Sequence, residues 1–125
     1  MRYMMMIYGD ESAFVSIPQE AMMQVMADYD AFHAEMGQRG NLLIAERLHP
    51  TPTATTVSVQ AGKTLLTDGP FAETKEQLAG IYVFECKDLD EALEIAAKIP
   101  SAKFGSVEVR PVLVGPEGGA TNSGQ

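Results

Sequence analysis

The apolar and polar positions of the chain alternate between the period of a strand and the period of a helix. Residues 2–8 and 80–86 are apolar at both alternating sets of positions, which is typical of strands buried on both faces. Residues 42–49 and 106–114 also predict strands, because their two sets of side chains face opposite ways. Residues 55–67 form two short β-branched runs around the turn sequence AGK, which predicts a hairpin.

Two segments carry apolar residues at the three- and four-residue spacing of a helix. The first runs from about residue 17 to 38. Ser16 just before it and Gln19 in its first turn have the spacing of a capping box. The second follows Asp88, which has Glu91 at the same spacing. We therefore expect two amphipathic helices, each covering a sheet with one face.

The expected order is β-α-β-hairpin-β-α-β, which predicts an α+β fold: a ferredoxin-like βαββαβ protomer with an extra hairpin. Residues 1–114 form a single domain in this interpretation, and the Gly-rich tail 115–125 is expected to be disordered. Two of the strands are apolar on both faces, yet the helices cover one face of the sheet. A bare second face would expose a large apolar patch, so we expect a homodimer that pairs sheet against sheet.

Composition narrows the class of protein. The chain has 125 residues, 46% of them hydrophobic, which is enough for a packed core. A net charge of −8 argues against nucleic acid and against an anionic membrane as partners, because both need a basic surface. There is no apolar run of the roughly 20 residues that cross a bilayer, and we expect no signal peptide, because acidic residues follow the short apolar run of the N-terminus at once. A single cysteine, Cys86, fits a reducing cytoplasm.

The most distinctive segment is TDGPFAETKEQLAG, residues 67–80. Asp68 can accept hydrogen bonds from the backbone N–H groups that follow it, and Phe71 is expected to pack this loop onto the core. In that interpretation the segment is a braced turn. In the other, Asp68 and Glu73 line a pocket, with Phe71 as part of its wall.

The chain resembles the YCII-related family, and within it the subgroup named after its DGPF motif. The resemblance runs from YMMMIYGDE through LLTDGPFAETKEQLAG and IYVFECKDLDEALEIAAKIP to GSVEVRPV. It implies a dimeric α/β barrel made of two ferredoxin-like protomers. Some members use a His–Asp pair as acid and base; the position of that histidine falls here near Tyr29 and Asp30. Members of the subgroup are often encoded beside extracytoplasmic-function sigma factors, which makes such a factor a partner implied by the resemblance alone.

His33 is the leading histidine, because it lies on the apolar face of the first predicted helix beside Tyr29. There it could meet Asp68 or Glu108 of the sheet and act as a general acid or base, with Asp68 as its catalytic partner. Tyr29 would line the same pocket. The alternative is a neutral histidine with one hydrogen-bond partner, at the helix edge or in the core.

Three arginines could orient an anionic ligand: Arg2, Arg47 and Arg110. Arg110 is the preferred one, because it alternates with Val107 and Val109 and should point away from the helices, toward the expected dimer cavity.

We expect neither a metal nor a cofactor. The two histidines, His33 and His49, and the single Cys86 match no zinc spacing, and there is no Gly-rich nucleotide motif. His49 is expected to be exposed in its Pro- and Thr-rich surroundings. The lone cysteine has no adjacent histidine that would make it a nucleophile.

Two functions remain open at this point. The first is binding of a small, anionic ligand near the sheet and the DGPF loop, with acid–base chemistry of the lyase or isomerase kind. Its residues would be Asp68, His33 and Arg110, with Phe71, Glu73 and Tyr29 around the ligand. The second is a non-enzymatic regulatory or interaction module, linked to a sigma factor.

Overall fold

The computed structural model describes residues 1–114, so the expected tail lies outside the described residues. The strands are β1 (Arg2–Gly9), β2 (Leu42–Arg47), β3 (Thr55–Gln60), β4 (Lys63–Asp68), β5 (Gln77–Glu85) and β6 (Ser106–Pro111); the helices are α1 (Glu11–Val15), α2 (Gln19–Arg39) and α3 (Leu89–Lys98), with 3-10 turns η1 (Thr51–Thr53) and η2 (Pro100–Lys103).

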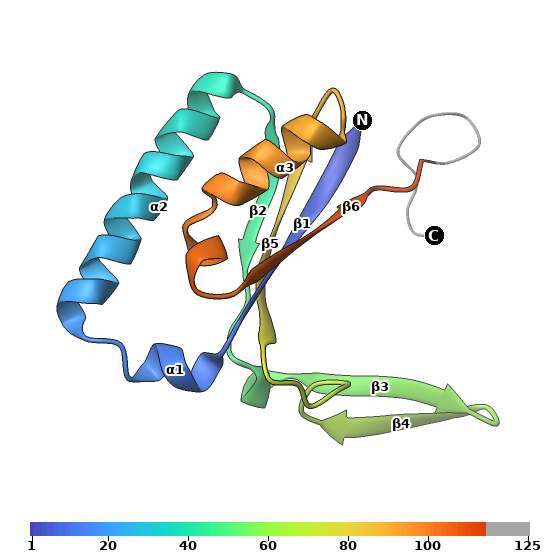
Figure 1. Ribbon diagram of the computed structural model, residues 1–125. Coiled ribbons are helices and arrows are strands. Elements are labelled where there is room, and N and C mark those ends of the chain that lie inside the picture. The colour runs from blue at the N-terminus through green and yellow to red at the C-terminus, as the bar shows by residue number, and fades with distance from the viewer. Residues whose placement is uncertain (115–125) are drawn as a thin grey trace.

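Four of the strands form one sheet in the order β2-β5-β1-β6, and every neighbouring pair is antiparallel. The other two, β3 and β4, pair only with each other. Helices α2 and α3 lie on one face of the four-stranded sheet (Figure 1). The α+β class expected from the sequence is therefore confirmed.

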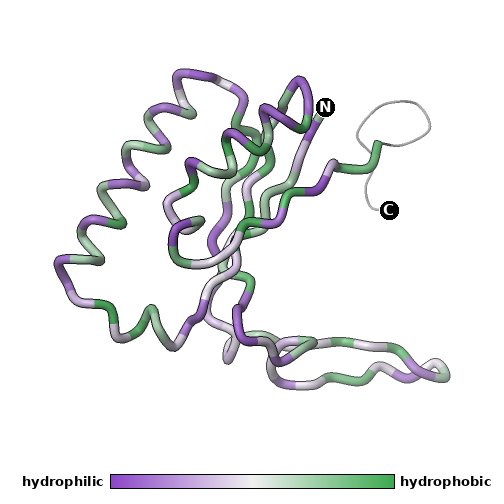
Figure 2. The backbone as a smooth tube through the Cα atoms, viewed as in Figure 1, coloured by the Kyte–Doolittle hydropathy of each residue, from purple (hydrophilic) through white to green (hydrophobic). Residues whose placement is uncertain are grey.

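The core lies between that sheet face and the two helices. Along β1 the residues Tyr3, Met5 and Ile7 are buried, and the residues between them are partly exposed. Phe84 of β5 and Met36 of α2 are completely buried against them. Apolar stretches of the sheet strands and of the facing helices come together in Figure 2. Burial of these side chains is the main favourable contribution to folding.

The start of the first long helix differs from the expectation. Asp10 caps a separate short helix, α1, because its carboxylate accepts the N–H groups of Ser12 and Ala13. A hydrogen bond from the Ser12 hydroxyl, followed by the one from the Ala13 N–H, lowers the pKa of Asp10. Ser16 then ends α1, and α2 begins after Pro18 without any side-chain cap. The proposed Ser16–Gln19 capping box is therefore wrong, because a separate helix, α1, precedes α2 and ends at Ser16.

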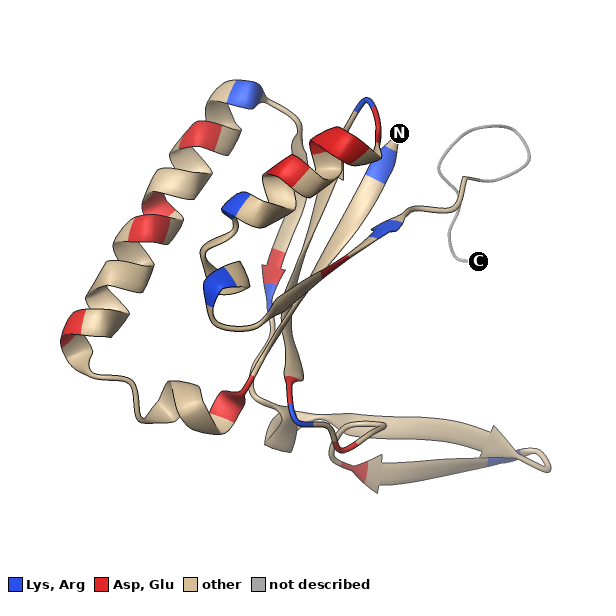
Figure 3. Cartoon of the chain, in the orientation of Figure 1, with Lys and Arg blue, Asp and Glu red and all other residues tan. Residues whose placement is uncertain are grey.

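The capping box at the second helix is confirmed. The Asp88 carboxylate accepts the N–H of Glu91 at 2.9 Å, and the Glu91 carboxylate accepts the N–H of Lys87 at 2.8 Å. Farther along, charged side chains join α3 to α2: the Arg39 guanidinium lies 2.5 Å from the Glu94 carboxylate, which lowers the pKa of Glu94. Charged residues occur along much of both helices (Figure 3).

The face of the sheet away from the helices, which we call the open face, carries two rows of side chains. The strand register places them as Ile44, Val83, Met4 and Arg110 in one row and Glu46, Ile81, Met6 and Glu108 in the next. Each row is apolar over much of its length and charged at one or both ends. In residues 1–114 no other element covers this face (Figure 1).

The β3–β4 hairpin stands apart from both layers. It leaves the end of the sheet and projects to the side opposite α2 (Figure 1). Ala61 and Gly62 at its tip both have positive φ, as in the tight two-residue turns that match the twist of a hairpin. Almost all of its strand residues are exposed.

Candidate functional site

The candidate site is built around His33 of α2. Its Nε2 atom lies 2.7 Å from the hydroxyl oxygen of Tyr82 of β5, a hydrogen-bond distance. The His33 side chain is otherwise exposed to solvent, whereas Tyr82 is only 5% exposed. The pair therefore connects the aromatic core to the surface. The expected meeting of His33 with Asp68 or Glu108 does not occur, because Glu108 lies on the other face of the sheet and Asp68 ends β4 in the hairpin.

Tyr82 stays neutral in this environment. Burial raises the pKa of its phenol well above the ordinary value, the nearby Tyr29 adds to this, and Arg47 opposes it. In residues 1–114 His33 is the hydrogen-bond partner found for the Tyr82 hydroxyl. A buried hydroxyl proton needs an acceptor, so Nε2 accepts it and the neutral imidazole carries its own proton on Nδ1. His33 thus offers an N–H donor to the solvent side.

Aromatic rings hold this pair in place. The ring of Tyr29 lies 5.9 Å from that of His33, one helical turn before it, and Phe32 packs edge-on against Tyr82. The Tyr29 hydroxyl lies 2.5 Å from the Ser101 hydroxyl of η2, which fixes the end of that side chain. Tyr29 and His33 are neighbours on one face of α2, as their spacing in the sequence predicted.

Arg47, at the end of β2, supplies positive charge on the same face of the sheet. Ala45 pairs with Tyr82 and Arg47 pairs with Gly80, so the register places Arg47 diagonally beside Tyr82. A Cβ atom on Gly80 would come within 2.8 Å of the backbone oxygen of Glu46, so only glycine permits this close pairing. Within residues 1–114 the Arg47 guanidinium forms no ion pair.

A shallow depression of about 260 Å³ adjoins this arginine and is lined by Arg47, Leu48 and His49. His49 is exposed, as expected. An uncompensated guanidinium, an imidazole N–H donor and flanking aromatic rings together suit a small anion with an unsaturated or aromatic body.

The structure places the DGPF segment elsewhere. Asp68 ends β4 at the base of the hairpin. Asp68 and Glu73 are exposed, and Phe71 is 92% exposed, so the expected packing of Phe71 onto the core is wrong. In the described part of the chain no hydrogen bond reaches the Asp68 carboxylate. The turn is held instead by Gly69, whose N–H donates to Ala54 and whose carbonyl accepts the Thr56 hydroxyl.

Arg110 points away from the helices, as its alternation with Val107 and Val109 predicted. It is not free, however. Its guanidinium nitrogen lies 2.7 Å from the Glu108 carboxylate on the same face, and that hydrogen bond raises the pKa of Arg110. The Glu108 carboxylate thus offsets the positive charge of Arg110, which the sequence analysis expected to bind an anionic ligand. The structure does not bring Arg110 together with His33, which lies on the helix side of the sheet.

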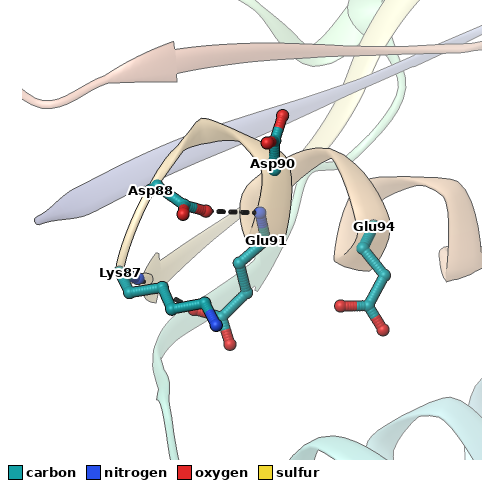
Figure 4. A pocket seen from close by; sticks show the side chains of 5 residues that line it. All are labelled: Lys87, Asp88, Asp90, Glu91 and Glu94. Atoms are coloured by element: carbon teal, nitrogen blue, oxygen red, sulfur yellow. Dashed lines mark hydrogen bonds between the residues drawn. The ribbon is translucent and has the colours of Figure 1, made fainter.

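A second depression, of about 360 Å³, lies at the N-terminal end of α3 (Figure 4). Its lining is Lys87, Asp88, Asp90, Glu91 and Glu94, and the closest contacts among them belong to the capping box of that helix. The acidic side chains there repel an anion and have structural partners. Within residues 1–114 no three His, Cys, Asp or Glu side chains gather as metal ligands do.

Tyr82 and Ser101 were missed by reasoning from sequence. Tyr82 lies in a strand that is apolar on both faces, so its ring was counted with the core. The usable signal was its hydroxyl, since a buried tyrosine oxygen needs a polar partner and His33 lies on the facing helix. Arg47 was named with two other arginines, but only the register places it beside this pair.

The assignment of the His33 proton gives a direct prediction. In the wild-type protein at a pH where the ring is neutral, we expect the Nδ1–H tautomer, because Nε2 accepts the Tyr82 hydroxyl proton. Tyr82→Phe removes that donor and should return His33 toward the Nε2–H form that an exposed ring prefers. Long-range ¹⁵N–¹H NMR correlations of the ring distinguish the two forms. Identical tautomers in both proteins would contradict the hydrogen bond as described.

The amino-acid sequence is similar to that of known proteins. Residues 1–114 match the family model of the YCII-related domain. An uncharacterised protein of Rhizobium meliloti (strain 1021) is 42% identical over 116 residues, which cover 91% of this chain and 94% of that protein. Among the helices of the described residues, none combines the length and apolar character needed to cross a membrane.

Proposed function

Since the chain belongs to the YCII-related family, we propose that it acts as a homodimer that binds a small aromatic or unsaturated anion beside the His33–Tyr82 pair. One observation carries the proposal: the solvent-exposed His33 lies 2.7 Å from the buried hydroxyl of Tyr82, and Arg47, diagonally beside Tyr82 in the sheet, forms no ion pair in residues 1–114. Arg47 supplies the charge and His33 supplies an N–H donor. The rings of Tyr29 and His33 supply an apolar edge for the body of the ligand.

The same pair limits the chemistry. Nε2 of neutral His33 already accepts a hydrogen bond from the Tyr82 hydroxyl, so it is a poor general base on that side. When the ring is protonated, its Nε2–H donates to the Tyr82 oxygen, and Nδ1 can pass its proton to a basic atom of the bound anion, which leaves the neutral Nε2–H ring. An acid-catalysed proton transfer is therefore the reaction that the site supports, if the ligand has a site to receive the proton. Asp68 and Arg110 stay candidates for a second contact only through another copy of the chain.

The homodimer is the second part of the proposal. The strand order β2-β5-β1-β6, with α2 and α3 on one face, supports a ferredoxin-like protomer with the β3–β4 hairpin as an addition. The open face carries Met4, Met6 and Ile81 near its centre. Stacking two such faces would bury these side chains and build the barrel that the family resemblance implies.

The binding proposal is tested with benzoate, a probe that combines a carboxylate with an aromatic ring. Benzoate at about ten times its dissociation constant should add roughly 1.4 kcal/mol of stability, which shifts the melting temperature of a domain of this size by several degrees. Benzyl alcohol at the same concentration, with sodium chloride to equalise the ionic strength, is the matched control and should have little effect. Equal shifts from both compounds, or none from benzoate up to its solubility limit, would overturn the proposal.

A regulatory or interaction module remains the second candidate function. The observation that favours it is the β3–β4 hairpin, whose strands expose Val57, Val59 and Leu66 rather than burying them in the protomer. In that case the family's association with sigma factors would indicate the partner. A failure of benzoate to bind would make this candidate the leading one.

A further inference from the structure

We propose that the β3–β4 hairpin is an arm that packs against a second copy of this chain and completes its dimer interface. The inference rests on the homodimer of the proposed function and names the part of the chain that closes it. The arm is defined as residues 55–68. Its contact face is defined as Val57, Val59 and Leu66.

Those three residues share one face of the arm. Val57 pairs directly with Leu66, and Val59 lies two residues along the same strand, so their side chains point the same way. Their exposed fractions are 59%, 66% and 68%. The opposite face carries Ser58, Thr56 and Leu65, of which Leu65 is the only large apolar residue. One face is thus apolar and uncovered in the protomer.

Hydrogen bonds hold the chain at the base of the arm, whereas nearly all of the strand residues of the arm are exposed. The Glu11 carboxylate accepts both the N–H and the hydroxyl of Thr51 in η1, at 2.9 and 2.7 Å. The N–H of Glu11 donates to the side chain of Gln77, where β5 begins. The Thr56 hydroxyl donates to the carbonyl of Gly69 across the base of the hairpin. These bonds hold the segments that flank the arm: η1 before it is bonded to α1, α1 is bonded to the start of β5, and the hairpin is closed at Gly69.

The direction of the arm favours a second copy as the occupant. The arm projects to the side of the sheet opposite α2, which is the side of the open face (Figure 1). A copy stacked on the open face would therefore have the arm beside it. A lone two-stranded hairpin is marginally stable in water, so an extended hairpin with an uncovered apolar face calls for a packing partner.

The area of the interface supports the same conclusion. Four strands of about six residues, spaced about 4.8 Å apart with a rise of about 3.3 Å per residue, outline a flat face of roughly 400 Å². A stable interface buries about 800 Å² on each partner. The arm enlarges the surface that two stacked copies can bury. One face of the arm adds roughly half as much again, and the arm of the other copy contributes equally by symmetry.

The test is sedimentation equilibrium of the full chain at micromolar concentration. We expect the wild type to have twice the protomer mass of 13.5 kDa. The double variant Val59→Thr/Leu66→Thr keeps β-forming residues but makes the contact face polar, and its dimer dissociation constant should rise by about tenfold or more. Leu65→Thr on the opposite face is the matched control and should change that constant by less than about threefold.

The outcomes separate the two proposals. A monomeric wild type would overturn the homodimer and, with it, the arm. A dimeric wild type whose dissociation constant is unchanged in the double variant would leave the homodimer standing and overturn the arm. An equal weakening by Leu65→Thr would also overturn the assigned contact face. Far-UV circular dichroism of each variant shows whether the protomer is still folded.

Discussion

Replacing Gly105 by alanine should destabilise the protein by about 3 kcal/mol or more. A Cβ atom at this position would lie 2.1 Å from the carbonyl oxygen of Tyr8 and 3.1 Å from the Cα of Gly9. Both are backbone atoms of β1, which is paired with β5 on one side and β6 on the other. Because β1 is held from both sides, the strand cannot move aside without breaking its ladders.

Gly37→Ala is the matched control for this prediction. Gly37 lies exposed within α2, and a Cβ atom there would meet nothing within 4 Å. Alanine has the higher helix propensity, so the control should gain about 0.5–1 kcal/mol. Both values come from urea denaturation at one fixed protein concentration, since the unfolding of a dimer depends on concentration. A Gly105→Ala protein as stable as the wild type would contradict the close approach of β1 and the turn before β6.

The second large effect is expected at Arg47. Arg47→Gln removes the guanidinium but keeps a polar side chain of similar length, so it should weaken benzoate binding about tenfold or more. A hydrogen bond to a charged group contributes about 1.5–3 kcal/mol, and 1.4 kcal/mol corresponds to a factor of ten. Isothermal titration calorimetry measures the loss, and the far-UV spectrum shows that the fold is retained.

Arg110→Gln serves as the control for the choice of arginine. Its guanidinium is paired with Glu108 on the open face, so its removal should leave benzoate affinity within about twofold of the wild type. The sequence favoured Arg110 as the ligand anchor. If Arg110→Gln weakens binding and Arg47→Gln does not, the original preference is right and the site lies on the open face.

Much of the fold was predictable because it follows from periodicity. The burial of Tyr3, Met5 and Ile7 along β1 repeats every second residue, and the capping box of α3 needs only Asp88 and Glu91 at the right spacing. Both are local patterns. The cap of α2 was mispredicted because two candidate cap residues, Asp10 and Ser16, lie close together in the sequence. Asp10 caps the separate helix α1, and Ser16 ends that helix instead of capping α2.

The site was less predictable because it depends on long-range register. His33 was identified from its place on an apolar helix face, but its partner lies 49 residues away, and only the pairing of strands places Tyr82 beneath it. Phe71 illustrates the opposite error. A turn sequence sets local dihedral angles but does not determine whether the loop packs, and here the aromatic ring stays in solvent.

The most direct test of the proposed site is a map of where benzoate binds. In a ¹H–¹⁵N NMR titration of the wild-type protein, we expect the largest shifts at Tyr29, His33, Arg47 and Tyr82, with small changes on the open face around Arg110. These four residues come from α2, β2 and β5 and meet only in the folded protein. Shifts centred on Arg110 or on the DGPF loop around Asp68, with α2 unaffected, would contradict the account.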